Sequence, residues 1–417
     1  MSGGVWIDSE IGRLRRVVVH TPGREIESMT PRTASEVLYH DIIPISVVSD
    51  EHAVLRRLLG LVAQVDEVTD LLAGALSNSG VRERLVHAVC RKEPATRRTD
   101  ELLALPPAEL VATLVAGLPA RRDTLEAVLY GPEHDLPPLP NLYFMRDSSF
   151  VLRDSVVIGA MAHPVRTTEA MLLRALFSAS PRAGTGILLD GCADDPARNG
   201  IRLEGGDVLV LRRDLLVVGI SERTSASALD ELATRTAATV GEPLRVIAVL
   251  VPHDRSTIHL DMIFTLVDHD TALVYEPYVT GPQRLDVYRM HLEPGRSTRI
   301  EKSDGLVAAL ADEGAPVRTI PCGGSDPVVR EREQWLSAAN AFAFAPGKAI
   351  GYDCNVATME AFSRAGFAVH RADEFLSGRR NVDDYDHLYV GMPGINLARG
   401  GGGPRCMTLP ILRDPVG

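Results

Sequence analysis

Near the end of the sequence, a cysteine follows four glycines, a proline and an arginine, in the order Gly400-Gly-Gly-Gly-Pro-Arg-Cys406. Side chains do not crowd this backbone, so a small molecule could approach the sulfur closely, as attack by a thiolate requires. Free cysteine is also among the residues most often buried, so Cys406 could instead be a small apolar residue of a C-terminal strand. The choice between these two interpretations depends on the other polar residues of the chain.

Four polar clusters interrupt the apolar runs of the sequence, at positions where we expect strands to end. They are Asn141-Leu-Tyr-Phe-Met-Arg-Asp147, Leu203-Glu204-Gly-Gly-Asp207, Gly219-Ile-Ser-Glu-Arg223-Thr-Ser and His259-Leu-Asp261-Met-Ile-Phe. We predict that His259 and Asp261 lie two apart on a strand, so that both face the same way, as an acid/base beside a cation clamp would. Singly, each cluster could be a helix cap, a turn, a surface ion pair or a buried histidine. Together with Cys406, they indicate one reaction centre.

The elements that would position these clusters are short strands alternating with helices. The first strand is expected within Ile11–His20, and the leucine spacing of residues 51–66 is that of a helix. Further strands are predicted at Ser149–Leu152, Val156–Ile158, Val208–Leu211, Leu215–Gly219, Arg245–Leu250, Met262–Val267 and Ala272–Tyr275, and helices at Thr168–Leu176, Ala226–Thr236 and Val356–Ala365. This alternation is typical of an α/β architecture, and a structural repeat could exist within it without an exact sequence repeat.

Residues 70–132 differ in composition from the rest of the chain. Leucine and alanine dominate there, and helix-forming windows such as Thr99-Asp-Glu-Leu-Leu-Ala and Pro107-Ala-Glu-Leu-Val-Ala follow one another. We therefore predict an all-helical insertion, which could be a lid or a packing module without a chemical role. The 417 residues suffice for one large α/β domain or for two to three smaller ones.

Charge and composition exclude several classes of protein. The net charge of −11 lacks the basic excess of a nucleic-acid-binding protein, and no segment approaches the roughly 18 apolar residues of a membrane-spanning helix. Because the N-terminus lacks a basic and apolar leader, we expect a cytoplasmic protein. The five cysteines are widely spread and the twelve histidines lack metal-ligand spacing, so we expect reduced thiols and no metal site.

In their order along the chain, the motifs resemble those of the arginine deiminase family. The resemblance is carried by Asn-Leu-Tyr-Phe-Met-Arg-Asp, Glu-Gly-Gly-Asp, Ser-Glu-Arg-Thr, His-Leu-Asp-Met-Ile-Phe-Thr, Arg332-Glu-Gln-Trp and Gly-Gly-Pro-Arg-Cys-Met. It extends to the opening Ser9-Glu-Ile-Gly-Arg-Leu and His20-Thr-Pro-Gly-Arg-Glu-Ile-Glu, and to the late Gly351-Tyr-Asp-Cys-Asn355. It covers nearly the whole length, and the motifs are jointly specific.

This resemblance implies both a fold and a reaction. The implied fold is the pentein fold, a five-bladed α/β propeller with pseudo-fivefold symmetry, formed as a single catalytic domain by residues 1–417 with 70–132 as its helical insertion. The implied reaction is hydrolysis of the guanidinium of L-arginine to L-citrulline and ammonia, without metal or organic cofactor. The implied partner is a small-molecule substrate, and a homo-oligomer, either a dimer or a tetramer, is expected from the resemblance.

The resemblance also implies roles for individual residues. Asp147 and Asp261 would hold the guanidinium, and Cys406 would attack its carbon to form a covalent thiouronium intermediate. His259, oriented by Glu204, would protonate the leaving ammonia and then activate water. The substrate-binding positions that match are Asn141, Phe144, Arg166, Arg223, Asp207 and Gly400. Of these, Arg166 and Arg223 would grip the α-carboxylate with planar, two-pronged donors, and Phe144 would flank the aliphatic stem.

Gly401 departs from the family pattern. The family usually carries an arginine at this point of the glycine run, expected to gate the site or contact the substrate, whereas this chain has Gly401 and an arginine two residues upstream, Arg399. Three alternatives therefore stay open: an amidinotransferase with an amine acceptor, a deiminase of a modified arginine or other guanidino compound, and a non-catalytic pentein. A redox sensor would need a resolving cysteine near Cys406 in the sequence, and there is none.

Overall fold

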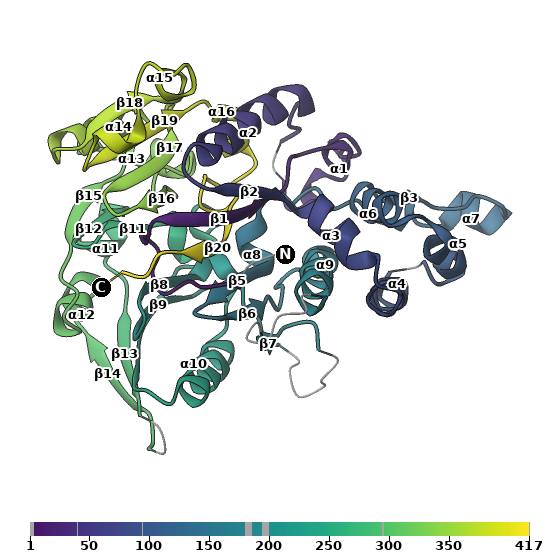
Figure 1. Cartoon of the computed structure of the whole chain (residues 1–417), viewed down its shortest axis with the longest axis horizontal. Coiled ribbons are helices and arrows are strands. Elements are labelled where there is room, and N and C mark those ends of the chain that lie inside the picture. The colour runs from purple at the N-terminus through teal and green to yellow at the C-terminus, as the bar shows by residue number, and fades with distance from the viewer. Residues whose placement is uncertain are drawn as a thin grey trace.

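The computed structural model describes residues 4–39, 41–93, 95–179, 186–193, 200–293 and 296–416, which form a mixed α/β fold (Figure 1). Within these residues, five sheets mix antiparallel and parallel pairing, and a sixth is a two-stranded hairpin. Short runs of valine, leucine and isoleucine form many of the strands; β9 (Leu215–Ile220) is buried at every position except its last. Such continuous burial is typical of strands covered on both faces.

In each of the five mixed sheets, an antiparallel pair is continued by a parallel strand. Three sheets have three strands: β20 (Leu409–Arg413), β1 (Leu14–Val19) and β2 (Gln64–Glu67); β5 (Ser149–Leu152), β6 (Ser155–Ile158) and β7 (Ile187–Asp190); and β11 (Phe264–Asp268), β12 (Thr271–Val274) and β15 (Arg318–Pro321). One sheet has five strands, in the order β8 (Val208–Arg212), β9, β10 (Leu244–Leu250), β13 (Val287–Leu292) and β14 (Arg299–Ser303). The last has four strands, in the order β16 (Phe342–Ala345), β17 (Lys348–Tyr352), β19 (Leu388–Met392) and β18 (Ala368–Arg371). The same three-strand arrangement thus recurs five times.

Helices fill the crossovers that lead to the parallel strands, as parallel pairing requires. They are α2 (Ile45–Gly60), α9 (Thr167–Ser178), α10 (Ala226–Val240), α12 (Leu306–Asp312) and α14 (Val356–Arg364). In α10, the Ser225 side chain caps the first turn by accepting from the Ala228 amide, and Gly241, with φ of 65°, ends the helix. Further helices are α1 (Arg24–Glu27), α8 (Met145–Ser148), α11 (Glu276–Val279), α13 (Pro327–Trp335), α15 (Ala372–Leu376) and α16 (Ile395–Arg399).

A group of helices projects from one side of the sheets (Figure 1). It consists of α3 (Val68–Leu76), α4 (Ser79–Lys92), α5 (Thr99–Ala104), α6 (Pro107–Ala116) and α7 (Leu125–Tyr130). The predicted all-helical character of 70–132 is not complete, because β3 (Leu118–Pro119) pairs with β4 (His134–Leu136). The reason is that Gly117 ends α6 with φ of 82°, and the chain continues extended through a proline.

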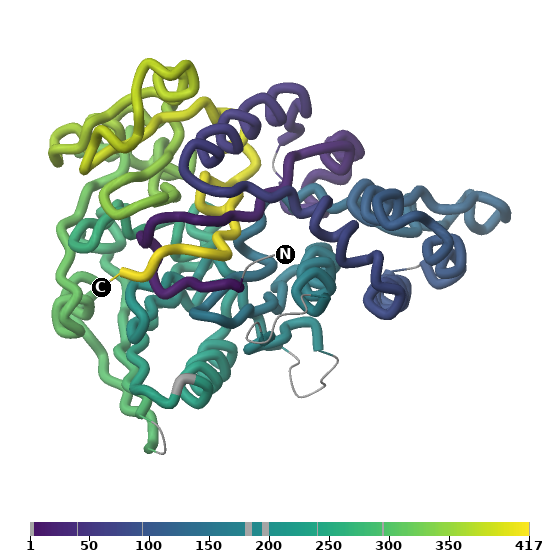
Figure 2. The backbone as a smooth tube through the Cα atoms, in the orientation of Figure 1, coloured from purple at the N-terminus to yellow at the C-terminus, as the bar shows by residue number. Residues whose placement is uncertain are grey.

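The two ends of the chain meet in one sheet, where β1 pairs with β20 (Figure 2). Beyond this pairing, the Trp6 amide donates to the Ile411 carbonyl at 2.8 Å. This closure brings the N-terminal segment against the residues that precede β20, which include Cys406. No helix in the described part of the chain is both long and apolar enough to cross a membrane.

Candidate active site

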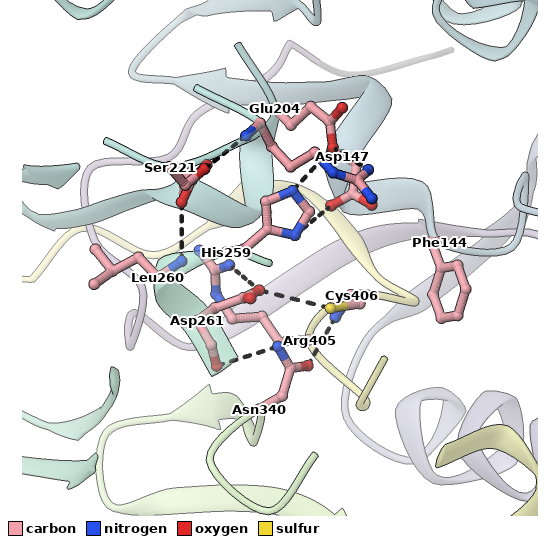
Figure 3. A network of polar contacts seen from close by, with 12 residues as sticks. Phe144, Asp147, Glu204, Ser221, His259, Leu260, Asp261, Asn340, Arg405 and Cys406 are labelled. Carbon is pink, nitrogen blue, oxygen red and sulfur yellow. Dashed lines mark hydrogen bonds and ion pairs between the residues drawn. The ribbon is translucent and has the colours of Figure 1, made fainter. Parts of the chain in front are cut away.

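In each of the five mixed sheets, the strand that begins the antiparallel pair is entered through a short turn that carries polar residues. The residues are Asp147 before β5, Glu204 and Asp207 before β8, His259 and Asp261 before β11, Asn340 before β16, and Cys406 before β20. Figure 3 labels these side chains, except Asp207, and shows them gathered from the different turns. The repeated arrangement of the sheets therefore brings together residues that lie far apart in the sequence.

His259 and Asp261 do not lie on a strand, contrary to the prediction. Asp261 belongs to a short 3-10 turn, Leu260–Met262, which His259 precedes, and β11 begins only at Phe264. The turn sends the two side chains to different partners, since His259 meets Glu204 and Asp261 meets Arg405. The polar residues make the difference, because the Leu260 amide donates to the buried Asp207 carboxylate at 2.9 Å instead of joining a sheet.

A cavity of about 490 Å³ lies over these turns. Of the predicted residues, Cys406, His259, Asp147, Asn141, Phe144, Arg166, Arg223 and Gly400 line it. Glu204, Asp207 and Asp261 are fully buried behind the lining residues. The structure thus brings all of the predicted site residues into one region, eight of them at the cavity surface and three behind it.

His259 is held by Glu204 at the floor of the cavity. Its Nε2 lies 2.9 Å from a Glu204 carboxylate oxygen, and its Nδ1 lies 3.8 Å from Asp147 Oδ1. Burial opposes the charged imidazolium, but the neighbouring carboxylates outweigh it and raise the pKa of His259 to about 9. A Cβ on Gly206 would lie 2.6 Å from the imidazole ring, so only glycine permits this approach.

Glu204 stays ionised in spite of its burial. Desolvation opposes its charge, but the bond with His259 and the nearby Arg223 outweigh it and lower the pKa of Glu204. The Ala162 amide also donates to this carboxylate, at 3.0 Å. An ionised Glu204 fixes the ring of His259 and favours its protonated form.

Asp147 and Asp261 share a feature. An arginine donates to one oxygen of each carboxylate, and the other oxygen is bare, which here means that it accepts no hydrogen bond from the described residues. Arg166 Nη1 donates to Asp147 Oδ2 at 2.6 Å, and Arg405 Nη1 donates to Asp261 Oδ2 at 2.7 Å. Asp147 Oδ1, Asp261 Oδ1 and His259 Nδ1 are buried without a hydrogen-bond partner among the described residues. Buried polar atoms without partners are costly, so these three mark a place prepared for a polar ligand.

Cys406 lies beside these bare atoms. Its backbone amide donates to Asn340 Oδ1 at 3.1 Å, and its sulfur lies 3.7 Å from Asp261 Oδ2 (Figure 3). Burial and the negative charges of Asp261 and Asp147 raise the pKa of this thiol well above its ordinary value. The ligand-free site therefore holds a neutral thiol, which a bound cation would convert toward the thiolate.

The outer part of the cavity contains the remaining predicted contacts. Arg166 is committed to Asp147 and to Glu169, which accepts from Arg166 Nε and Nη2 at 3.1 and 2.8 Å. Arg223 Nη1 donates to Glu204 at 3.4 Å, whereas its buried Nε makes no hydrogen bond and lies 3.7 Å from Glu222 Oε1. Asn141 donates to the Val37 carbonyl at 2.9 Å. Of the two arginines, Arg223 is therefore the freer to bind a new anion.

One cluster in the described residues has the spacing of a metal site. One ligand atom from each of Asp147, Glu204 and His259 lies within 4.8 Å of the other two. Arg166 and Arg223 already pair with its two carboxylates and supply positive charge to the same place. The arrangement accordingly needs no cation to balance the carboxylates.

Sequence reasoning gave no role to three residues that complete the site. Asn340 holds the Cys406 amide, and Arg405 joins Asp261 to the buried Glu10. Arg405 and Glu10 both belong to motifs that carried the family resemblance, Pro-Arg-Cys-Met and Ser9-Glu-Ile-Gly. That shared motif membership was a signal that could have identified them.

Comparisons with known proteins identify relatives of this chain. The family model described as arginine deiminase matches residues 35–413. An arginine deiminase of Listeria welshimeri is 33% identical over 98% of both chains, and one of Latilactobacillus sakei is 30% identical over 100% of both.

Solved structures of similar fold include the amidinotransferase SxtG of Microseira wollei, with a TM-score of 0.53 at 12% identity over 99% of this chain and 98% of that one. They also include a Pseudomonas aeruginosa DDAH in complex with citrulline, with a TM-score of 0.51 at 13% identity over 95% of this chain and 99% of that one. At these identities, the two structures support the mixed α/β fold alone.

Proposed function

This chain belongs to the arginine deiminase family, and on that premise we propose that it hydrolyses the guanidinium group of L-arginine to L-citrulline and ammonia. The observation that carries the proposal is the set of bare, buried atoms around Cys406, namely Asp147 Oδ1, Asp261 Oδ1 and His259 Nδ1. A guanidinium offers five N–H donors in one plane. It could satisfy both carboxylate oxygens while its central carbon faces the sulfur.

In the proposed first half-reaction, the Cys406 sulfur forms a bond to the guanidinium carbon. The positive substrate offsets the negative charges of Asp147 and Asp261, so the thiol releases its proton to solvent and attacks as the thiolate. His259, protonated at neutral pH, gives its proton to the departing nitrogen as the C–N bond breaks. Ammonia leaves, and the rest of the substrate stays on the sulfur as a thiouronium.

The second half-reaction reverses the role of the imidazole. His259, now neutral, takes a proton from a water molecule whose oxygen adds to the thiouronium carbon. The C–S bond then breaks and its electron pair returns to Cys406. The hydroxyl that water supplied releases its remaining proton to solvent, where ammonia takes it up, and citrulline leaves. Glu204 holds the ring in the same orientation throughout, which lets one histidine serve both steps.

We assign the α-carboxylate of the substrate to Arg223 and Arg166, with Asn141, Phe144 and Gly400 along the stem. Arg223 Nε makes no hydrogen bond, although it lies 3.7 Å from Glu222 Oε1, and this supports its assignment. Arg166 would have to exchange part of its bonding to Asp147. Asp207 accepts from Ser221 and from the Leu260 amide at 2.6 and 2.9 Å, so we assign it to positioning the turn of His259 rather than to the substrate.

For the architecture, we propose that the five mixed sheets are the blades of an α/β propeller. The recurrence of one strand arrangement and the polar turn at the entrance of every sheet support it. We further propose one catalytic domain over 1–417, with 70–132 as its helical insertion. The homo-oligomer and the cytoplasmic location stay predictions.

A second candidate is a deiminase of a substituted arginine or another guanidino compound. At Gly401, with φ of 99°, an added Cβ would meet no atom within 4 Å, so the cavity has open space where the family usually has an arginine. That space favours a substrate larger than free arginine. An amidinotransferase would use the same site up to the thiouronium and differ only in the acceptor.

The deciding experiment incubates the purified protein with L-arginine without added metal and measures citrulline and ammonia together. Cys406→Ala is the test variant, and Cys354→Ala, which removes a partly buried thiol outside the cavity lining, is its matched control. Equal amounts of both products, lost only in Cys406→Ala, are expected. A parallel reaction with added primary amine tests for transfer.

Three results would contradict the proposal. Folded protein without turnover of L-arginine, but with turnover of a substituted guanidino compound, would favour the second candidate. A new guanidino product in the presence of amine would favour an amidinotransferase. Full activity of Cys406→Ala would remove the nucleophile from the mechanism.

A further inference from the structure

Arg405, the residue immediately before the nucleophile, is among the largest fully buried side chains of the molecule. Its guanidinium grips Glu10 with two parallel bonds, Nε to Oε2 and Nη2 to Oε1, both of 3.1 Å. A third bond runs from Nη1 to Asp261 Oδ2 at 2.7 Å, and a fourth from Nη2 to the Val208 carbonyl at 2.8 Å. Arg405 does not line the cavity, so it can act on the reaction only indirectly, through its bond to Asp261 and through its charge near Cys406.

These bonds fix the orientation of the Asp261 carboxylate. Oδ2 faces Arg405 and the Cys406 sulfur, whereas Oδ1 is left bare. The Asp261 main-chain carbonyl accepts from Asn340 Nδ2 at 3.3 Å, and Asn340 also holds the Cys406 amide. Asn340 and Arg405, which come from different turns, therefore fix the position of Asp261 relative to Cys406.

Arg405 also balances charge beneath the sulfur. Its neighbours are two buried carboxylates, Glu10 and Asp261, and two buried cations, Arg146 and Arg413. Although burial opposes the charge of Glu10, Arg405 and Arg146 lower the pKa of this carboxyl to about 2. Removal of Arg405 would leave two buried carboxylates without the cation that they share, an arrangement that proteins strongly disfavour.

We infer that Arg405, anchored by Glu10, is a positioning residue of this reaction, which turns the free oxygen of Asp261 toward the guanidinium and supplies positive charge beneath Cys406. The inference rests on the proposed function for its effect on turnover. Its effect on the thiol does not depend on any substrate. Glu10 and Arg405 lie 395 residues apart, so the closure of the chain by β1 and β20 contributes directly to the reactive geometry.

The test compares Arg405→Met, Arg405→Lys and Glu10→Gln. Misplacing a clamp by about 1 Å lowers turnover roughly 100-fold, and we expect a fall in kcat of this size for Arg405→Met. Arg405→Lys keeps the positive charge but loses the planar, two-pronged donor, so its kcat should lie between that of Arg405→Met and that of the wild type. Glu10→Gln should lower kcat about tenfold, because Arg405 loses its two-pronged anchor.

A second readout is labelling of Cys406 by iodoacetamide across pH, followed by mass spectrometry of the Cys406 peptide. Without the cation at 405, the pH at which labelling becomes fast should move upward in Arg405→Met and return toward the original value in Arg405→Lys. This readout also separates the two proposals. If the wild-type protein turns over no L-arginine but the labelling profile still shifts in Arg405→Met, the proposed function is overturned and the positioning role of Arg405 stands.

Arg413→Met is the matched control. Arg413 is equally buried and lies in the same C-terminal segment, but it donates to the Gly12 and Ala343 carbonyls, at 2.6 and 2.7 Å, and to no carboxylate of the described residues. It should lower the Tm with little movement of the labelling profile. If Arg405→Met fails to fold, Glu10→Gln carries the test. Folded Glu10→Gln or Arg405→Met with unchanged kcat and labelling would overturn the inference, as would equal shifts in Arg413→Met.

Discussion

At the floor of the cavity, Cys406 and His259 are buried and each bonds a residue from the turn of another sheet, whereas at the rim Arg399, Gly401 and Arg255 are exposed. Arg399 donates to Asp41, to Asn396 and to the Ile42 carbonyl, all near the surface. A buried, multiply bonded group cannot move without losing several partners, whereas an exposed one can. We therefore expect substitutions at the floor to abolish chemistry and those at the rim to change which substrate is used.

The largest effect in this comparison is expected at His259. His259→Ala removes the acid and base of both half-reactions, so we expect kcat to fall by about 10⁴-fold. The rate of citrulline release measures it, and circular dichroism confirms the fold of the variant. A fall of less than tenfold would transfer the acid/base role to another group.

The next effect concerns the pH dependence set by Glu204. The proposed acid is His259 with a pKa of about 9, so kcat should hold below that pH and decline as the pH rises through it. Glu204→Gln removes the charge that favours the imidazolium. It should move this alkaline limb to lower pH and lower kcat by about 100-fold. If the alkaline limb of the kcat profile stays at the same pH in Glu204→Gln, Glu204 does not set the pKa of His259.

The same shift affects stability. The folded pKa of His259 lies above the unfolded value of 6.5, so its contribution is fully present below pH 6.5 and is lost as the pH rises toward 9. Urea unfolding at pH 6 and pH 9 measures this loss, and Glu204→Gln should reduce the difference.

At the rim, a smaller effect is expected from Arg255. This exposed side chain lines the cavity and makes no hydrogen bond or ion pair with the described residues. Its field should attract the substrate carboxylate, so Arg255→Ala should raise KM about tenfold with little change in kcat. The increase should shrink at high salt, because the side chain is exposed. A change in kcat alone would place Arg255 in the chemistry.

The smallest effect is expected at Gly401. Gly401→Arg should fill the open space and lower kcat/KM for larger guanidino compounds a few-fold more than for L-arginine. The positive φ makes any side chain there cost about 1 kcal/mol. Gly401→Ala has the same strain without the bulk, so it should lower the Tm equally and leave the preference unchanged. Equal losses for all substrates in Gly401→Arg would exclude Gly401 from specificity.

Apolar, β-branched runs made several elements predictable. Ser149–Leu152 was predicted with the same bounds as β5, and Val208–Leu211 nearly matches β8. The helix expected at 51–66 runs instead from Ile45 to Gly60, because Gln64–Glu67 forms β2. That strand is polar and only partly buried, so apolar periodicity could not detect it.

The sequence by itself determined which residue types the site would use and the mixed α/β composition, because motifs and periodicity are local properties of the chain. Only the tertiary structure decided how those residues act. It placed Arg405 between Glu10 and Asp261, committed Arg166 to Asp147, and left one oxygen of each clamp carboxylate bare. The physical reason is that such contacts depend on how sheets from distant parts of the chain pack together, and no local pattern encodes a distance between residues hundreds of positions apart.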